Sequence, residues 1–362
     1  MATPFHHRPF PDYIFASPLT AGLYPLHHLL NRLRGPPLLP PPDARPIRVV
    51  CISDTHTLEC SDVPDGDLLI HAGDLCNDGS AREIQASVDW LRQLPHRHKV
   101  VICGNHDSYF DVRSRLAEDR HDPDHDGIKS SSAFAEISSS TASLHTVDDD
   151  LPSRIHWGDD IHYLQHSSVT LTFPNGRSLA LYGAPQVPAI VPFGPEHAFT
   201  YPPHHDAWSG TVPPATDILI THTPPAAHLD LSPVFSTGCP FLLAEAWRVR
   251  PRLHVFGHVH AAYGAEPVYW DEAQRAWERL CAARRRRARA SRLNAFLLGW
   301  LRDLFDLSGW VDSARVVVYG VLGVVWSRVW GGENRGAGWM LNAACMYRDS
   351  GRLGNKPQVV DL

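Results

Sequence analysis

Six short apolar runs, each ending in small or polar residues, constrain the fold of this chain more than any other feature. Their β-branched content and their lengths are typical of strands in a sheet that is covered on both faces. Between the second and third runs, Ile84, Val88 and Leu91 recur at helical spacing, with Ser80 as the expected N-cap. This β-α-β order predicts an α/β fold. The six runs are residues 47–53, 67–73, 99–104, 178–184, 217–222 and 253–258.

Carboxylate, amide and imidazole side chains follow these runs directly, where each predicted strand ends. Functional groups in open α/β sheets collect at the carboxyl ends of the strands, so we expect these side chains to lie together. Oxygen ligands combined with imidazole suit Mn, Fe or Zn, and the lack of thiolates argues against a structural zinc. The candidates are Asp54, His56, Asp74, Asn105, His106, Asp107, His222, His258 and His260.

The last pair, in Gly-His-Val-His at 257–260, is weak evidence alone, because the chain contains 23 histidines and several adjacent pairs. The whole set is stronger, since a carboxylate such as Asp74 can bridge two ions. Two aspartates, one asparagine and four histidines can then serve two divalent ions, with His258 and His260 on different ions. His71 is expected to pack at a strand end, and the alternative is that it orients a ligand carboxylate.

The order of the pieces, D-x-H, G-D, G-N-H-D, a single His and G-H-x-H, resembles the calcineurin-like metallophosphoesterase superfamily. The resemblance covers roughly residues 47 to 268 and a closing strand near 339 to 361. It implies two packed mixed β-sheets flanked by helices, an α/β/β/α sandwich. Further stretches such as "LITHTPPAAHLD" resemble the branch that contains the metallophosphoesterase-domain proteins and their fungal relatives.

The resemblance also assigns ligands to two divalent ions that share one carboxylate. The first ion would take Asp54, His56, Asp74 and His260. The second would take Asp74, Asn105, His222 and His258. His106 matches the catalytic imidazole of the family, and Asp107 matches the carboxylate that orients it. A hydroxide bridging the two metals would be the nucleophile.

These residues predict a phosphodiesterase that acts on small substrates such as cyclic nucleotides. A phosphomonoesterase and a weakly active metal-binding scaffold are the alternatives, and the intact Gly-His-Val-His favours catalysis. Ser/Thr protein phosphatases of the superfamily carry an arginine after G-D, where this chain has "GDLCNDGS". The net charge of -6 gives little support to nucleic-acid binding. Seven scattered cysteines and the lack of an evident secretory signal predict a cytoplasmic protein.

Three stretches lie outside the metal motifs. Residues 1–45 are expected to be an extension with a short amphipathic helix and a proline-rich linker, ahead of a catalytic domain over 46–362. The acidic, serine-rich insertion 117–150 is expected to be a solvated loop rather than a second metal site.

The insertion 281–338 begins with six arginines between Arg284 and Arg292 and continues into amphipathic and apolar helical sequence. This pattern predicts reversible attachment to an anionic membrane surface, so that the protein would be peripheral on a membrane. Its apolar core, Val316 to Trp326, is too short to span. The alternative is a helical hairpin that packs against the domain's own flank.

Overall fold

The computed structural model describes most of the chain. It covers residues 14, 17–37, 45–116, 119, 154–189, 198–232, 236–290, 301–332, 334, 336–348 and 350–362. The predicted loop 117–150 lies outside the described residues apart from position 119, and so do residues 291–300 of the second insertion.

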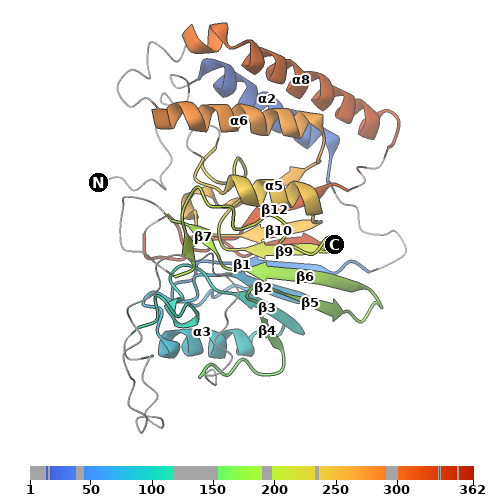
Figure 1. The fold of residues 1–362 in the computed structure, drawn as a ribbon. Helices are drawn as coiled ribbons and strands as arrows, with labels where there is room; N and C mark the ends of the chain where they lie inside the picture. The colour runs from blue at the N-terminus through green and yellow to red at the C-terminus, as the bar shows by residue number, and fades with distance from the viewer. Residues whose placement is uncertain are drawn as a thin grey trace.

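The first sheet has the strand order β13-β1-β2-β3-β4 (Figure 1). Four of its strands run parallel, namely β1 (Arg48–Ile52), β2 (Leu68–Ala72), β3 (His98–Ile102) and β4 (Ile161–Tyr163). β13 (Gln358–Asp361) pairs antiparallel with β1. Because β1, β2 and β3 are parallel and adjacent, the residues that follow them meet at one edge of the sheet.

The second sheet has the order β11-β12-β10-β9-β6-β5. β6 (Ser178–Ala184), β9 (Ile218–Thr221), β10 (Leu253–Phe256) and β12 (Gly338–Asn342) run parallel. β5 (Ser167–Thr172) and β11 (Gly264–Val268) form antiparallel edges. All six predicted strands are confirmed, but the closing strand expected near 339–361 is two strands, β12 and β13, one in each sheet.

The two sheets pack face to face over a core of aliphatic side chains. Ile70 and Ile102 of the first sheet and Leu181, Ile220 and Val255 of the second are fully buried in it. Helices cover both outer faces, as Figure 1 shows, so the predicted α/β/β/α sandwich is confirmed.

The outer face of the first sheet is covered by α3 (Ala81–Gln93), on which Ile84, Val88 and Leu91 are buried. Ser80 is its N-cap, and the Ser80 hydroxyl accepts a hydrogen bond from the backbone N–H of Glu83. The second sheet is covered by α5 (Pro240–Val249). The shorter elements are η1 (Ser108–Phe110), η2 (His260–Ala262), β7 (Val187–Pro188) and β8 (Thr200–Tyr201).

Beyond α5 lies a layer of three helices, α2 (Pro18–Arg34), α6 (Glu272–Ala290) and α8 (Leu307–Arg328) (Figure 1). Leu23 of α2, Trp277 of α6 and Val316 of α8 share one buried cluster. The ring of His27 stacks on Trp277 at 4.7 Å between centroids. The helix predicted within residues 1–45 therefore exists, begins at Pro18, and packs against the second insertion.

Candidate metal centre

Four candidate residues at the strand ends have left-handed backbone conformations. The φ angles are 53° at Asp54, 47° at His56, 53° at Asp74 and 67° at His258. Residues other than glycine rarely adopt this backbone conformation. It is found most often at functional sites, where the surrounding structure holds it in place. The residues that follow β1, β2 and β10 therefore adopt a strained backbone conformation, which directs their side chains toward one another.

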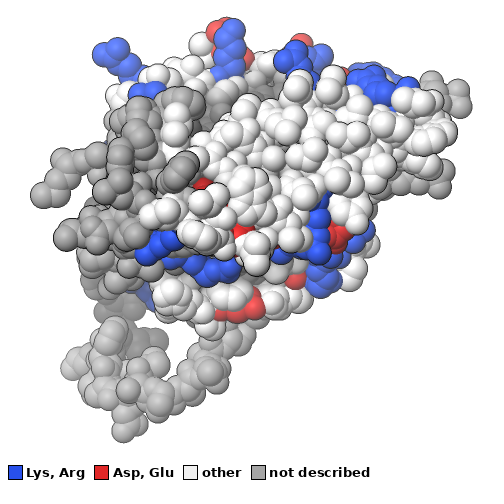
Figure 2. Space-filling model, turned by 90° about the horizontal axis from the view of Figure 1, so that it is seen from above, with Lys and Arg blue, Asp and Glu red and all other residues white. Residues whose placement is uncertain are grey.

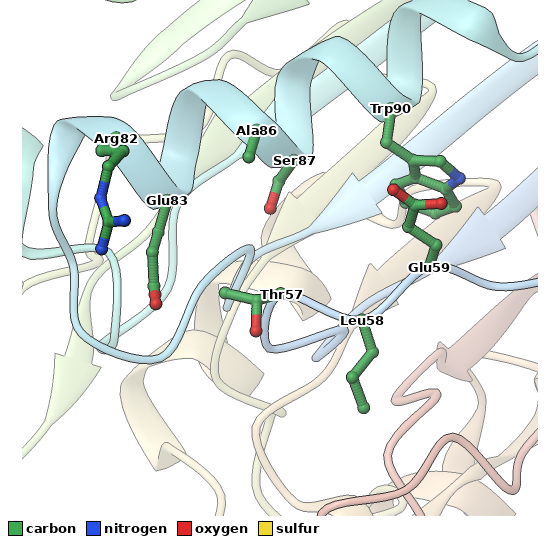
Figure 3. A pocket seen from close by; sticks show the side chains of 8 residues that line it. All are labelled: Thr57, Leu58, Glu59, Arg82, Glu83, Ala86, Ser87 and Trp90. Carbon is green, nitrogen blue, oxygen red and sulfur yellow. The ribbon is translucent and has the colours of Figure 1, made fainter.

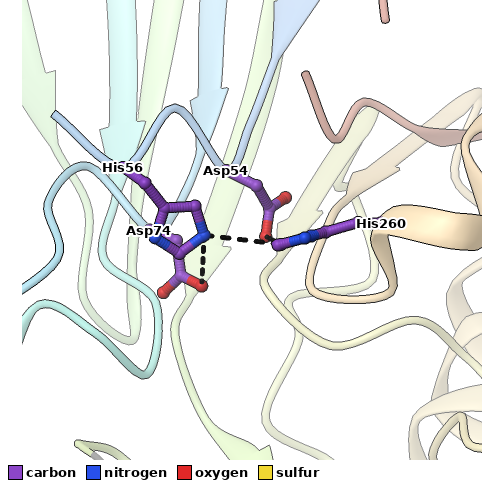
Figure 4. Close-up of side chains that lie close together, drawn as sticks. All are labelled: Asp54, His56, Asp74 and His260. Atoms are coloured by element: carbon purple, nitrogen blue, oxygen red, sulfur yellow. Dashed lines mark hydrogen bonds and ion pairs between the residues drawn. The ribbon is translucent and has the colours of Figure 1, made fainter. Parts of the chain in front are cut away.

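The first group consists of Asp54, His56, Asp74 and His260, whose ligand atoms all lie within 4.8 Å of one another (Figure 4). Nε2 of His260 lies 3.1 Å from Oδ1 of Asp54 and 3.4 Å from Nε2 of His56. Asp54 and Asp74 are buried, and the two imidazoles are largely so. Two carboxylates and two imidazoles in this space are a donor set that fits a divalent cation.

The second group surrounds His222, which follows β9 in the other sheet. Its Nε2 lies 3.3 Å from Oδ2 of Asp74 and 3.1 Å from Oδ1 of Asn105. The ring of His258 lies beside it, with 5.1 Å between the ring centroids. The structure therefore brings all seven predicted ligand side chains together, and Asp74 belongs to both groups.

Backbone carbonyl oxygens orient two of these imidazoles. Nδ1 of His222 lies 2.9 Å from the oxygen of Ala72, and Nδ1 of His260 lies 2.7 Å from the oxygen of Arg348. In each pair Nδ1–H donates to the carbonyl, which leaves the Nε2 lone pair directed at the cluster. Ligating histidines in metal sites are held in this way.

Two glycines of the motifs permit close approach of backbone to carboxylate. A Cβ atom added at Gly104 would overlap Oδ1 of Asp74, and one added at Gly257 would overlap Oδ2 of Asp54. The backbone N–H of His258 donates to both oxygens of Asp54, at 3.0 and 3.1 Å. The glycines before Asn105 and His258 are thus part of the geometry of the centre.

The electrostatics favour positive charge on His222 and His260, whereas burial lowers the pKa of His56 and lowers that of His258 to about 3. Burial by itself lowers the pKa of His222, but the carboxylates of Asp74 and Asp54 and the carbonyl of Ala72 together outweigh burial and raise the pKa to about 9. Burial also lowers the pKa of His260, but the hydrogen bond to Asp54 and the charge of that carboxylate lead the effects that raise this pKa to about 9. Protons and a divalent cation therefore compete for the same nitrogens, so that cation binding releases protons.

His106 and Asp107 follow Asn105 but make different contacts. Nδ1 of His106 lies 3.0 Å from the carbonyl oxygen of Asn77, and its ring packs edge-on against His56. The buried Asp107 carboxylate accepts hydrogen bonds from the backbone N–H groups of Gly104 and Cys76, at 2.7 and 3.1 Å. Burial, and then the charge of Asp74, raises the pKa of Asp107 to about 6. The Asp107 carboxylate thus joins the loop after β3 to the loop after β2. The catalytic roles of His106 and Asp107 stay predictions.

Asn77 is a site residue that the sequence reasoning missed. Besides its carbonyl contact with His106, its side-chain amide donates to the backbone oxygen of His56 at 3.1 Å. Its position three residues after Asp74 was the available signal. His71 is fully buried, and its Nε2 lies 2.9 Å from Oγ1 of Thr55, so it packs behind the ligands as expected of a strand-end residue.

A cavity of about 190 Å³ lies between α3 and the loop that follows β1 (Figure 3). None of the nine candidate residues is among its described lining residues, although Thr57 follows His56 directly. The cavity is therefore separate from the candidate metal centre. Its lining consists of Thr57, Leu58, Glu59, Arg82, Glu83, Ala86, Ser87 and Trp90.

Known proteins share the part of the chain that builds this centre. A family model described as calcineurin-like phosphoesterase matches residues 47–262, which include every candidate residue. Metallophosphoesterase domain-containing protein 1 of Homo sapiens is 36% identical over 228 residues, or 60% of this chain and 61% of that protein. The UPF0046 protein K07C11.7 of Caenorhabditis elegans is 34% identical over 228 residues, 62% of this chain and 68% of that protein.

A fungal relative matches a longer part of the chain. The probable rhamnogalacturonate lyase C of Emericella nidulans is 37% identical over 278 residues, or 75% of this chain. The match covers 22% of that protein, so most of the named lyase lies outside the shared region.

Proposed function

The chain belongs to the calcineurin-like phosphoesterase family, and from that premise we propose that it is a phosphodiesterase for small phosphodiesters such as cyclic nucleotides. The family and the cluster around Asp54 support a metal-dependent phosphoric ester hydrolase. The observation that carries the proposal is the placement of Asp74 within hydrogen-bonding or ion-pairing reach of both ligand groups. Shared carboxylates are what a pair of adjacent cations requires.

Two divalent ions fit the donor set. Asp54, His56, Asp74 and His260 would hold the first. Asp74, Asn105, His222 and His258 would hold the second. Mn, Fe or Zn suits this mixture of oxygen and imidazole ligands. The ions would acidify water and stabilise negative charge on the phosphoryl oxygens.

The chain's own contribution to bond cleavage comes from His106. Nδ1–H of His106 donates to the carbonyl of Asn77, which orients the imidazole ring, and Nε2 would be the atom that faces a substrate. As an imidazolium, His106 donates the Nε2 proton to the leaving oxygen and becomes neutral. Asp107 holds the backbone of Gly104 and thereby the loop from which His106 projects.

The loop after Asp74 favours a diester over a monoester. Asp78 stands at the motif position where Ser/Thr protein phosphatases carry an arginine. The Glu83 carboxylate adds a second acidic group to this loop, because it accepts hydrogen bonds from the backbone N–H groups of Asn77 and Asp78, each at 3.0 Å. When acidic groups replace an arginine, a monoester dianion loses more electrostatic binding energy than a diester monoanion, because it carries more negative charge. The diester is therefore the preferred substrate class.

Turnover with added Mn²⁺ tests the proposal on bis-p-nitrophenyl phosphate, p-nitrophenyl phosphate and 2′,3′-cyclic nucleotides. Faster turnover of the diesters is expected. Faster turnover of the monoester would make the protein a phosphomonoesterase. Turnover of none of them, in protein that contains metal, would favour the scaffold role.

A further inference from the structure

Helix α8 has a continuous outward row of exposed apolar side chains. At 100° per residue these positions share one side of the helix, and the side chains are 44% to 79% exposed. We name them the apolar face, which consists of Leu307, Trp310, Val311, Val318, Val321 and Leu322. We propose that the apolar face binds the surface of an anionic phospholipid membrane, with α8 parallel to the membrane plane.

Within the described part of the chain, the fold leaves this face exposed. The opposite side of α8 packs against α2 and α6 through Gly309, Ser313, Val316 and Gly320, all buried. A Cβ atom at Gly320 would lie 2.8 Å from Cδ1 of Leu30, so α2 and α8 are already in close contact there. The three helices pack against one another without the apolar face. A helix face that meets only water normally carries polar residues.

Charge at the borders of the face indicates its partner. Figure 2 shows a broad surface almost free of charged residues, with many Lys and Arg side chains and some Asp and Glu side chains along its borders. Arg302, Arg315 and Arg328 are exposed around α8. A net charge of -6 over the whole chain makes a local basic border necessary for approach to an anionic surface. Basic border residues around an apolar helical face are the composition of helices that lie in the membrane interface.

Aromatic side chains strengthen the assignment to lipid. Trp310, Trp326 and Trp330 are 48%, 54% and 71% exposed near the two ends of α8. Tryptophan prefers the boundary between lipid head groups and hydrocarbon.

The contacts of α8 determine its orientation. The helix is long and apolar enough to cross a membrane by length and composition alone. However, Asp312 forms an ion pair with Arg279 of α6 at 2.9 Å, and Nε of Arg328 donates to the oxygen of Leu33 in α2 at 2.7 Å. Crossing would break these contacts, whereas lying on the surface preserves them.

Flotation of the full chain with vesicles tests the proposal. We expect binding to vesicles of phosphatidylserine and phosphatidylcholine at low salt, loss of binding at high salt, and little binding to phosphatidylcholine alone. The variant V311S/V318S should reduce the bound fraction about ten-fold because it removes apolar groups from the face. The matched control is V112S/V359S, which replaces two exposed valines elsewhere and should bind as wild type.

Tryptophan quenching by brominated lipids tests the orientation. Stronger quenching by bromine near the head group than by bromine deep in the acyl chain is expected for α8 in the membrane plane. Deeper quenching would overturn that orientation. Unaltered binding in V311S/V318S, equal binding to neutral vesicles, or no binding to anionic vesicles would overturn the proposal. So would a dimer in light scattering that V311S/V318S dissociates, because a second copy would then cover the face.

Discussion

Oδ2 of Asp74 lies 3.3 Å from Nε2 of His222, a contact that joins the end of β2 in the first sheet to the end of β9 in the second. The same oxygen lies 3.7 Å from Nε2 of His56. The centre is therefore built across both sheets, and one carboxylate connects its two halves.

Replacing Asp74 with asparagine should lower the occupancy of both metal sites together. Asparagine keeps the volume but loses the charge that attracts two cations. Elemental analysis of protein purified without chelator and supplied with Mn²⁺ measures the occupancy. The control is Asp62→Asn, a surface carboxylate after β1. Loss of a single ion from Asp74→Asn would contradict the bridge.

His106→Ala should separate chemistry from metal binding. We expect unchanged metal content and a kcat lower by about two to four orders of magnitude, the range for a general acid. Steady-state kinetics on bis-p-nitrophenyl phosphate measures this, with the exposed His156→Ala as control. Wild-type turnover in His106→Ala would remove the residue from its assigned role.

Gly104→Ala should disturb the centre while the protein still folds. The added Cβ would overlap Oδ1 of Asp74, so the carboxylate must shift and both metal occupancies should fall with turnover. Gly22→Ala is the matched control, because nothing lies within 4 Å of the new Cβ in helix α2. The Gly22→Ala control should leave activity unchanged and raise the free energy of unfolding by up to about 1 kcal/mol, because alanine favours a helix more than glycine does. Two fully occupied sites in Gly104→Ala would show that the close approach is unnecessary.

The strands and the ligand cluster could be predicted because the information is local. A buried parallel strand is an apolar run, and its end carries the functional side chain, as at Asp54 and Asp74. Ser80 as N-cap was equally visible, since the capping residue lies next to the helix that it stabilises.

Contacts between distant segments could not be predicted. Arg284 counts toward a basic cluster in the sequence, but in the structure it is 3% exposed and forms an ion pair with Asp303. Ser17 donates to the same aspartate across 286 positions. Arg284 therefore cannot belong to a basic cluster that faces a membrane surface, because packing of α2 and α6 buries its guanidinium.

Arg284→Met should destabilise the three-helix layer. It leaves Asp303 buried without its cation, which costs about 3 to 5 kcal/mol in the free energy of unfolding. The double variant R284M/D303L should recover most of this loss, because two packed apolar side chains replace the pair. Urea unfolding followed by tryptophan fluorescence measures both. A double variant as unstable as Arg284→Met would show that the charge is not the cause.

A second buried ion cluster gives stability a defined dependence on pH. Nδ1 of His228 lies 2.6 Å from Oε1 of Glu266, and Nε2 lies 3.0 Å from Oε1 of Glu278. Burial alone would lower the pKa of His228, but these two carboxylates outweigh it and raise the pKa to about 10. The nearby His27 and His254 have pKa values lowered to about 3, chiefly by burial, so they are neutral and do not compete for the carboxylates.

His228→Gln should therefore destabilise the protein most at neutral and lower pH. An unfolded histidine titrates at about 6.5. The stabilisation from the charged His228 is complete below that value and is lost as the pH rises through about 10. We expect a loss of about 3 kcal/mol at pH near 7, which shrinks toward zero above pH 10. The control His27→Gln should have the same effect at both pH values, because His27 is neutral throughout. Urea unfolding of the three proteins at the two pH values measures the difference. A loss from His228→Gln that does not change with pH would mean that His228 is neutral in the folded protein.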